Sequence, residues 1–354
     1  MKAKSFKSFL KEDFEPYKLV ILTHSAAGVR DTKSEPAESG TELLKKVGKQ
    51  IGIQVETADF VGAYTKKEGD KRLLYSFEFD EDGEVQLPAS DDKVLKYQKP
   101  IVCDPKNTII MPRGLGTQGF TASRGWLDLV KEFEYDGFFI VNDIESYDIC
   151  TSKYLTYVNL KRFGFRTPKT VPIEHSEAAE AAFKRLKTDF PIILKSSTGT
   201  QTGVGVVIIE CMRTLRAVVQ MLLLYEKYLP LILQEYIKTD YDMRVVVCNG
   251  KVVGGIRREV MSDDIRSNVS LGAVAEQIEL TELEKRTAID ISNKLGLHLA
   301  GVDFIPSEDR EKIPPYCLEV NANLGLMGVE KRIEGSPTKK ILQELGDRDS
   351  WNTK

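Results

Sequence analysis

Two carboxylates and one amide lie in a pair of apolar, strand-like segments near the C-terminus. Asp303 is flanked by Val302 and Phe304, while Glu319 and Asn321 close the sequence LEVN. A carboxylate among apolar side chains is costly to bury unless it is paired or bound to a metal ion. Carboxylate and amide oxygens are hard ligands that suit Mg²⁺ or Mn²⁺. The pattern predicts a divalent-cation site, and the alternative is an edge strand whose polar side chains face water.

A lysine at the end of another apolar segment has surroundings that suit a phosphate group. Lys195 is followed by a turn rich in serine, threonine and glycine, from residue 196 to 205. Glycines let backbone N–H groups approach a phosphate closely, hydroxyls add donors, and the lysine adds a charge. The turn lacks the GK[ST] sequence of a Walker A loop. The alternative is a plain hairpin loop with a surface lysine.

A cationic cluster lies between these two features, on a predicted hairpin and the loop after it. Its members are Arg244, Arg257, Arg258, Arg266 and Asn268. If the metal site is real, these side chains can hold an anionic substrate or the transferring phosphoryl group. The alternative is a solvated face with salt bridges to Glu259 and to the aspartates at 263–264.

Two other segments allow a functional and a structural interpretation. The sequence GLGTQG at 114–119 follows a strand, and Asp143 lies where a dinucleotide-binding fold places a ribose-binding acid. Its alternative is an ordinary strand-to-helix loop. The segment 231–237 is a buried strand with Glu235 exposed, or a seam whose backbone holds an adenine edge.

The composition limits the function classes. The chain has 354 residues, with 50 Lys and Arg against 53 Asp and Glu, which gives a net charge of −3. This length suggests two or three domains. The near-equal numbers of basic and acidic residues argue against nucleic-acid binding driven by bulk charge. No apolar run approaches the about 18–20 residues that span a bilayer. The acids Glu12, Asp13 and Glu15 argue against a secretory or transit signal, and the five dispersed cysteines indicate a reducing, cytoplasmic setting.

Strand-like and helix-like segments alternate along the chain, which predicts an α/β fold. In the first part we expect strands at 18–24, 54–60, 107–112 and 137–142, and helices at 41–51 and 121–133. Residues 64–100 are predicted to be an insertion with a hairpin formed by 73–79 and 85–87. In the second part we expect strands at 167–171, 191–195, 205–210, 231–237, 243–248, 251–257, 298–305 and 316–320. The helices there are predicted at 176–187, with Ser176 as N-cap, at 213–228 and at 282–295, and Asn249-Gly250 predicts a tight hairpin turn.

In this order, the motifs resemble those of the ATP-grasp ligases, and most closely the RimK-like branch, which adds glutamate to the C-terminus of a ribosomal protein. The resemblance runs from about residue 109 to 346 and includes MPRGLGTQGF, GTQTGVGVV, LQEYI, YDMR, RSN, AGVDF and LEVNAN. It implies an α/β (α+β) architecture, the ATP-grasp fold preceded by an N-terminal α/β (pre-ATP-grasp) domain. The expected limits are 1–145 for the N-terminal domain, with the insertion at about 64–100, 146–346 for the ATP-grasp domain, and 347–354 for a C-terminal tail.

The resemblance also implies roles for individual residues. Arg258 and Arg266 match catalytic positions, and Asp303, Glu319 and Asn321 match the metal ligands. Arg244, Arg257 and Asn323 are expected to bind substrate. The implied ATP-binding residues are Lys153, Lys195, Gly199, Thr200, Gln201, Gly203, Gln234, Glu235, Tyr236, Ile237, Asp242, Arg266, Ser267 and Asn268.

The implied activity is that of an ADP-forming, ATP-dependent carboxylate–amine ligase that works through an acyl phosphate. The expected cofactors are ATP and Mg²⁺ or Mn²⁺, with two ions bound. The expected substrates are an amino acid, L-glutamate in the first place, and the C-terminal carboxylate of a peptide or protein, with a homo-oligomer as the assembly. The alternatives are a ligase with a small-molecule acceptor, as in glutathione or amino-acid biosynthesis, and a non-catalytic ATP-binding regulatory module.

Overall fold

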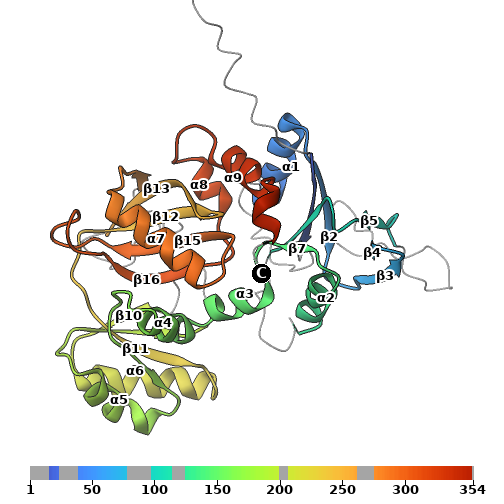
Figure 1. Ribbon diagram of the computed structural model, residues 1–354. Coiled ribbons are helices and arrows are strands. Elements are labelled where there is room, and N and C mark those ends of the chain that lie inside the picture. The colour runs from blue at the N-terminus through green and yellow to red at the C-terminus, as the bar shows by residue number, and fades with distance from the viewer. Residues whose placement is uncertain are drawn as a thin grey trace, which may run out of the picture. The chain divides into compact units, whose positions relative to one another are not determined.

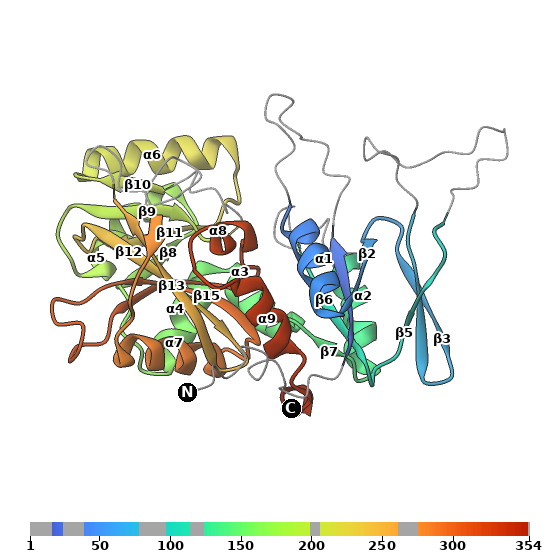
Figure 2. The same ribbon diagram turned by 90° about the horizontal axis from the view of Figure 1, so that it is seen from above.

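The computed structural model describes residues 16–23, 39–77, 97–113, 124–198, 206–260 and 275–352. They form helices and sheets of both parallel and antiparallel type (Figures 1 and 2). The chain divides into two compact units, one made of Met1–Arg113, Glu132–Ile140 and Thr338–Lys354, the other of Gly114–Lys131 and Val141–Pro337. The domain limits expected from the sequence stay a prediction.

The first unit is built on a parallel sheet with the strand order β2-β1-β6-β7. Its central strands are apolar runs, as expected for parallel strands that are covered on both faces. Helix α1 begins after Ser39, whose side chain accepts from the Glu42 N–H, and ends at Gly52, which has a positive φ of 82°. The predicted elements are confirmed here, although the last strand is shorter than expected. The bounds are β1 (Lys18–Thr23), α1 (Gly40–Ile51), β2 (Gln54–Asp59), β6 (Thr108–Pro112), α2 (Arg124–Tyr135) and β7 (Phe139–Ile140).

A three-stranded antiparallel sheet interrupts this pattern and corrects one prediction. Strand β4 (Lys71–Tyr75) pairs with β3 (Tyr64–Glu68) and with β5 (Ile101–Cys103). The described part of the predicted strand 73–79 pairs with β3 and β5 instead of opening a later hairpin, and the chain turns at Gly69, where φ is 63°. Residues 85–87 lie outside the described residues. The C-terminal elements α9 (Pro337–Leu345) and η4 (Arg348–Asn352) complete the unit, and Trp351 stacks on Phe139 with ring centroids 5.3 Å apart.

The second unit contains two antiparallel sheets. The smaller has the order β10-β9-β11-β8, and helices α5 and α6 bury its apolar face. The helix predicted from Ser176 begins instead as a 3₁₀ turn that is capped by His175, whose Nδ1 accepts from the Glu177 N–H. The bounds are α3 (Ile144–Thr151), α4 (Lys153–Arg162), β8 (Thr170–Ile173), η2 (Ser176–Ala178), α5 (Ala179–Leu186), β9 (Ile192–Ser196), β10 (Val206–Ile209), α6 (Met212–Tyr225) and β11 (Leu231–Glu235).

The larger sheet has the order β14-β13-β12-β15-β16 and packs on α7, which crosses it in Figure 1. Asn249 and Gly250 turn the chain between β12 and β13 with φ angles of 45° and 72°, as the sequence predicted. The bounds are β12 (Tyr241–Cys248), β13 (Lys251–Glu259), β14 (Ala275–Gln277), α7 (Glu282–Lys294), β15 (Leu299–Ile305), β16 (Tyr316–Asn321) and α8 (Leu326–Glu330). In the described part of the chain, no helix is long and apolar enough to cross a membrane.

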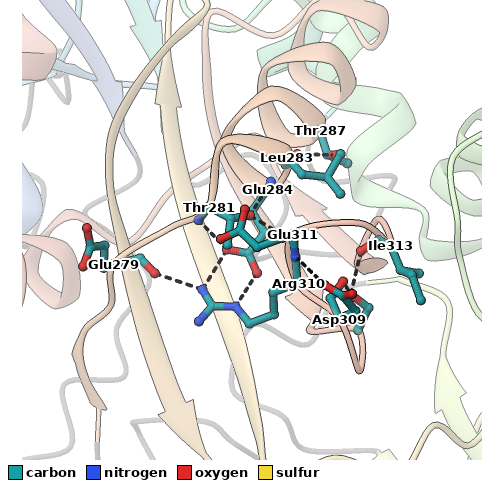
Figure 3. A network of polar contacts seen from close by, with 10 residues as sticks. Glu279, Thr281, Leu283, Glu284, Thr287, Asp309, Arg310, Glu311 and Ile313 are labelled. Atoms are coloured by element: carbon teal, nitrogen blue, oxygen red, sulfur yellow. Dashed lines mark hydrogen bonds and ion pairs between the residues drawn. The ribbon is translucent and has the colours of Figure 1, made fainter.

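A clamp joins the first turn of α7 to the loop between β15 and β16 (Figure 3). Glu284 is 1% exposed and accepts from Arg310 at 2.7 Å and 2.8 Å. It also accepts from the Thr281 N–H, and the Thr281 side chain caps the helix in return. The buried carboxylate is therefore fully satisfied, which fixes the loop that leads into β16.

Candidate functional site

Three charged side chains lie in one row across the larger sheet. Arg244 on β12 is the register partner of Asp303 on β15, and Asp303 is the partner of Glu319 on β16. Side chains of directly paired residues project from the same face of a sheet. The row therefore brings two predicted metal ligands and one predicted substrate-binding residue to a single face.

Asp303 is held by two guanidinium groups. Arg244 donates Nε to Oδ1 at 2.7 Å and Nη2 to Oδ2 at 2.6 Å. Arg258 Nη2 lies 3.1 Å from the same Oδ2. Burial alone raises the pKa of Asp303, but Arg244 and Arg258 outweigh it and hold that pKa below its usual value. Asp303 is therefore a charged carboxylate in the protein without ligands.

Arg258 forms a second paired contact, with Asp242. Its Nε and Nη2 donate to the two carboxylate oxygens at 2.6 Å and 2.8 Å. Burial opposes the charge of Arg258, yet Asp303 and Asp242 raise its pKa above the usual value. The Nη1 amino group takes no part in either contact. Arg258 is therefore a cation whose orientation two carboxylates fix.

Asn321 lies beside the same carboxylates. When its amide nitrogen faces Glu319, it donates to Oε1 at 3.1 Å while its oxygen accepts from Arg244 Nη2 at 3.2 Å. In this orientation the amide oxygen faces Arg244. Asp303, Glu319 and Asn321 lie close together, and their carboxylate and amide oxygens are the kinds of ligand that Mg²⁺ prefers. Among the described residues no group of three drawn from His, Cys, Asp and Glu forms a metal cluster, and the predicted set is of a different kind.

Lys195 lies at the end of β9 and is 8% exposed. Its Nζ donates to Gln234 Oε1 at 2.9 Å, and Gln234 donates in turn to Thr170 Oγ1 at 2.9 Å. Burial lowers the pKa of Lys195 to about 8, Glu319 opposes this change, and Lys153 adds to it. The charges of Glu319 and Lys153 thus both act on Lys195.

Lys153 opens helix α4 next to the end of β9. Its N–H donates to the Ser197 carbonyl at 2.8 Å, and Ser152 caps the helix by accepting from the Leu155 N–H. Helix N-termini favour anions, and this one begins with a lysine. The two predicted phosphate-binding lysines therefore lie at adjoining backbone segments.

The segment after β11 is partly buried. Glu235, the last residue of β11, accepts from the Lys169 N–H at 3.2 Å, and its carboxylate lies 3.6 Å from the Nζ of Lys169. Tyr236 and Ile237 follow directly and are half-buried. The predicted adenine-contacting residues thus lie where the chain leaves the smaller sheet, although their role stays a prediction.

Other predicted residues are not part of this grouping. Arg257 lies over the Tyr241 ring at 4.2 Å, and alternation along β13 turns it away from the face that carries Arg258. Asn323 is half-buried, and its Oδ1 meets no partner among the described residues. Gly199, Thr200, Gln201, Gly203, Arg266, Ser267 and Asn268 lie outside the described residues, as does the segment 114–119.

The structure adds two polar residues that the sequence analysis had not placed in the site. Thr170 completes the chain of hydrogen bonds from Lys195, and Asn142 binds the backbone next to Asn321. Asp143, the predicted ribose-binding acid of the dinucleotide alternative, caps helix α3 instead, accepting from Ser146 N at 2.8 Å. The one sequence signal for Asn142 is its position at the end of the apolar sequence FFIVN, where a polar side chain needs hydrogen-bond partners if it is buried.

Comparison with known proteins supplies the family. The RimK-like ATP-grasp domain matches residues 150–345. A probable alpha-L-glutamate ligase of Marinomonas sp. (strain MWYL1) is 27% identical and covers 88% of this chain and 92% of its own length. That of Coxiella burnetii (strain Dugway 5J108-111) is 33% identical over 57% of this chain and 65% of its own.

Solved structures agree on the fold. The ATP-grasp ligase PsnB complexed with a minimal precursor has a TM-score of 0.62, at 16% identity, and covers 94% of this chain and 99% of its own. D-cycloserine synthetase DcsG has a TM-score of 0.61 at 14% identity and covers 93% of this chain and 100% of its own. These likenesses show the ATP-grasp fold.

Proposed function

The chain belongs to the RimK-like ATP-grasp family of carboxylate–amine ligases, and on that premise we propose that it joins L-glutamate to the C-terminal carboxylate of a peptide or protein. ATP phosphorylates the acceptor carboxylate, and the amine of the amino acid then attacks the acyl phosphate and releases phosphate. The observation that carries the proposal is the row of Arg244, Asp303 and Glu319 on one face of the larger sheet, together with a buried Lys195 whose pKa Glu319 influences.

In this proposal the smaller sheet binds the nucleotide. Lys195 and Lys153 contact its phosphates, and Gln234 keeps the Lys195 ammonium in place through its 2.9 Å hydrogen bond. The segment 235–237 holds the adenine edge. The other residues assigned to ATP binding are Gly199, Thr200, Gln201, Gly203, Asp242, Arg266, Ser267 and Asn268.

In this proposal the residues of the larger sheet bind the metal ion and stabilise the negative charge of the phosphoryl group. Asp303, Glu319 and Asn321 would hold Mg²⁺, which when bound neutralises phosphate charge; Mn²⁺ as a substitute and a second ion are part of the proposal. Arg258 would stabilise the developing charge of the transferring phosphoryl group, and Asp242 fixes the orientation of its guanidinium. Because these groups are already oriented, their charge acts without reorganisation at the moment of reaction.

The acceptor is the least constrained part of the proposal. The relatives are named probable alpha-L-glutamate ligases, and PsnB binds a precursor peptide, whereas DcsG is a synthetase of D-cycloserine. We favour a peptide or protein acceptor because the curated relatives are named alpha-L-glutamate ligases and PsnB is solved with its precursor. Fold alone does not fix the substrate.

The test is ADP and phosphate release by the purified protein with Mg²⁺, a panel of single amino acids and a peptide acceptor, followed by mass spectrometry. Glutamate-dependent release with a product heavier by one or more glutamates supports the proposal. AMP and pyrophosphate would contradict the acyl-phosphate route. Nucleotide binding without turnover with any acceptor would favour the regulatory module instead.

A matched pair of variants assigns the activity to the site. Asp303→Asn removes a charge from the row and is expected to lower kcat at least a hundredfold. Asp290→Asn changes an exposed carboxylate on α7 whose side chain is 52% exposed, and it should leave kcat within twofold. Equal activity of the two variants would remove Asp303 from the proposal.

A further inference from the structure

Asn142 is a buried amide with all its hydrogen-bonding capacity used by backbone groups. It is 2% exposed. Its Nδ2 donates to the carbonyls of Leu299 at 2.7 Å and of Ala322 at 2.9 Å. Its Oδ1 accepts from the N–H groups of His298 at 2.8 Å and of Leu299 at 3.0 Å. Two donors and two acceptor lone pairs are thus all satisfied.

These four contacts lie at one end of the β15–β16 ladder. The backbone pairing of the two strands reaches Gly301 and Asn321. Leu299 and Ala322 lie just beyond that rung, where the strands no longer pair. The Asn142 amide bridges them there and so extends the ladder with a side chain.

The Ala322 carbonyl, which accepts from Asn142, lies between two residues with proposed roles in the site. Ala322 lies between Asn321, which converges with Asp303 and Glu319, and Asn323, whose Oδ1 is buried without a partner among the described residues. Fixing the carbonyl of Ala322 restrains the peptide that joins these two side chains. Asn142 itself makes no contact with the charged row.

A second contact holds the same region. Ser146, in the first turn of α3, has its Oγ 3.1 Å from both the Gly296 carbonyl and Asp143 Oδ2, and its single proton can be donated to either of them. At its other end α3 leads into Ser152 and Lys153, which bind Ser197. Helix α3 thus runs between the start of β15 and the phosphate-side lysine.

From these contacts we propose that Asn142 is a positioning residue for the Asn321–Asn323 turn, aligning Asn321 with the metal and Asn323 with the substrate. This inference rests on the proposed function. It predicts that changes at Asn142 act on divalent-cation affinity and on kcat, and leave nucleotide affinity without metal unchanged.

The test variant is Asn142→Asp, which keeps the size and the accepting oxygen but removes both donors. Loss of partners that orient metal ligands costs about 10–100-fold in metal affinity. We therefore expect Mn²⁺ binding to the ADP complex, measured by electron paramagnetic resonance, to weaken at least tenfold. ADP affinity without metal should stay within twofold. Asn159→Asp, which alters an amide bonded within α4, is the control and should change neither.

A pH signature separates positioning from a loss of stability. The protonated form of the new carboxyl can donate to one carbonyl, so the ratio of variant to wild-type activity should rise as pH falls. Hydrogen exchange in the protein without ligands should be faster for residues 316–327 in the variant. If Asn142→Asp fails to fold, Asn142→Ser retains one donor and should show the same effects at smaller size.

The outcomes are distinct. Unchanged Mn²⁺ affinity in a folded variant overturns the positioning role, even if its thermal stability falls. A wild-type protein that binds Mn²⁺ and ADP but forms no product contradicts the proposed ligase activity and leaves the positioning result to be decided by the variant. A wild-type protein that fails to bind Mn²⁺ with ADP contradicts both.

Discussion

Asp303 lies between two arginines, Arg244 and Arg258, whose charges offset the cost of burying its carboxylate. Isolated, the charge would be expensive in a site that is 5% exposed. Arg244 contacts both of its oxygens, and Arg258 links it to Asp242, so positive and negative groups alternate along the face. Such networks are weak sources of stability but strongly penalise the loss of one member. The arrangement therefore favours orientation over stability.

Lys195 gives a pH dependence whose sign follows from its burial. Its pKa of about 8 means that the ammonium loses its proton just above neutral pH. Phosphate oxygens favour the charged form, so nucleotide binding raises this pKa and takes up a proton. Affinity is therefore full below pH 8 and falls as pH rises through that value. We expect ADP to bind about tenfold more weakly at pH 9 than at pH 7, as measured by calorimetry.

Lys195→Arg provides the comparison for this prediction. A guanidinium keeps its charge throughout this range, so the variant should bind ADP with little change between the two pH values. A wild-type profile that is flat from pH 7 to 9 would show that Lys195 does not lose its proton there or does not contact the nucleotide.

At the scale of elements, strand register does the positioning. The alternation of β12 places Asp242 and Arg244 on one face, while β15 and β16 add Asp303 and Glu319 at matched positions. A slip of one residue in any of these strands would turn its charged side chain into the core under α7. The clamp of Glu284 and Arg310 fixes the loop between β15 and β16, and so helps to hold the register of these two strands.

Arg310→Ala should expose the importance of that clamp. The change leaves the Glu284 carboxylate buried at 1% exposure without its cation, and we expect the free energy of unfolding to fall by about 2–3 kcal/mol. Urea unfolding measures it. Arg286→Ala removes an arginine of the same helix region whose side chain is 82% exposed, and it should cost less than about 0.5 kcal/mol. Similar losses in both would contradict the clamp.

Elements with local signals could be predicted from the sequence, whereas long-range pairs could not. Asn249-Gly250 specifies its own turn, and the ends of α1 are marked by Ser39 and Gly52. The Gly69 turn was missed because a single glycine in a charged stretch is a weak signal. Arg244 and Asp303 are 59 residues apart and Asn142 and Ala322 are 180 apart, so their contacts depend on register and packing that no local pattern contains.

At the scale of the whole molecule, the two units predict an uneven response to nucleotide. The proposed binding residues all belong to the second unit. A ligand at a hundred times its Kd stabilises what it binds by about 2.7 kcal/mol. We expect Mg²⁺ and ATP to slow hydrogen exchange in β9, β11, β12 and β15 and to leave β1 and β6 unchanged. Equal protection of both sets would contradict a site confined to the second unit.

The network of ion pairs among Arg244, Asp303, Arg258 and Asp242 has a consequence for treatment with chelators. These two arginines and two aspartates compensate each other within the protein, and the remaining carboxylate, Glu319, acts on the buried Lys195 ammonium, so we expect the fold not to depend on a divalent ion for charge balance. Treatment with EDTA should therefore abolish turnover and leave the thermal midpoint and the far-ultraviolet dichroism as they were. Adding Mg²⁺ back should restore activity without a refolding delay, as in an enzyme that stays assembled between encounters with its metal–nucleotide substrate.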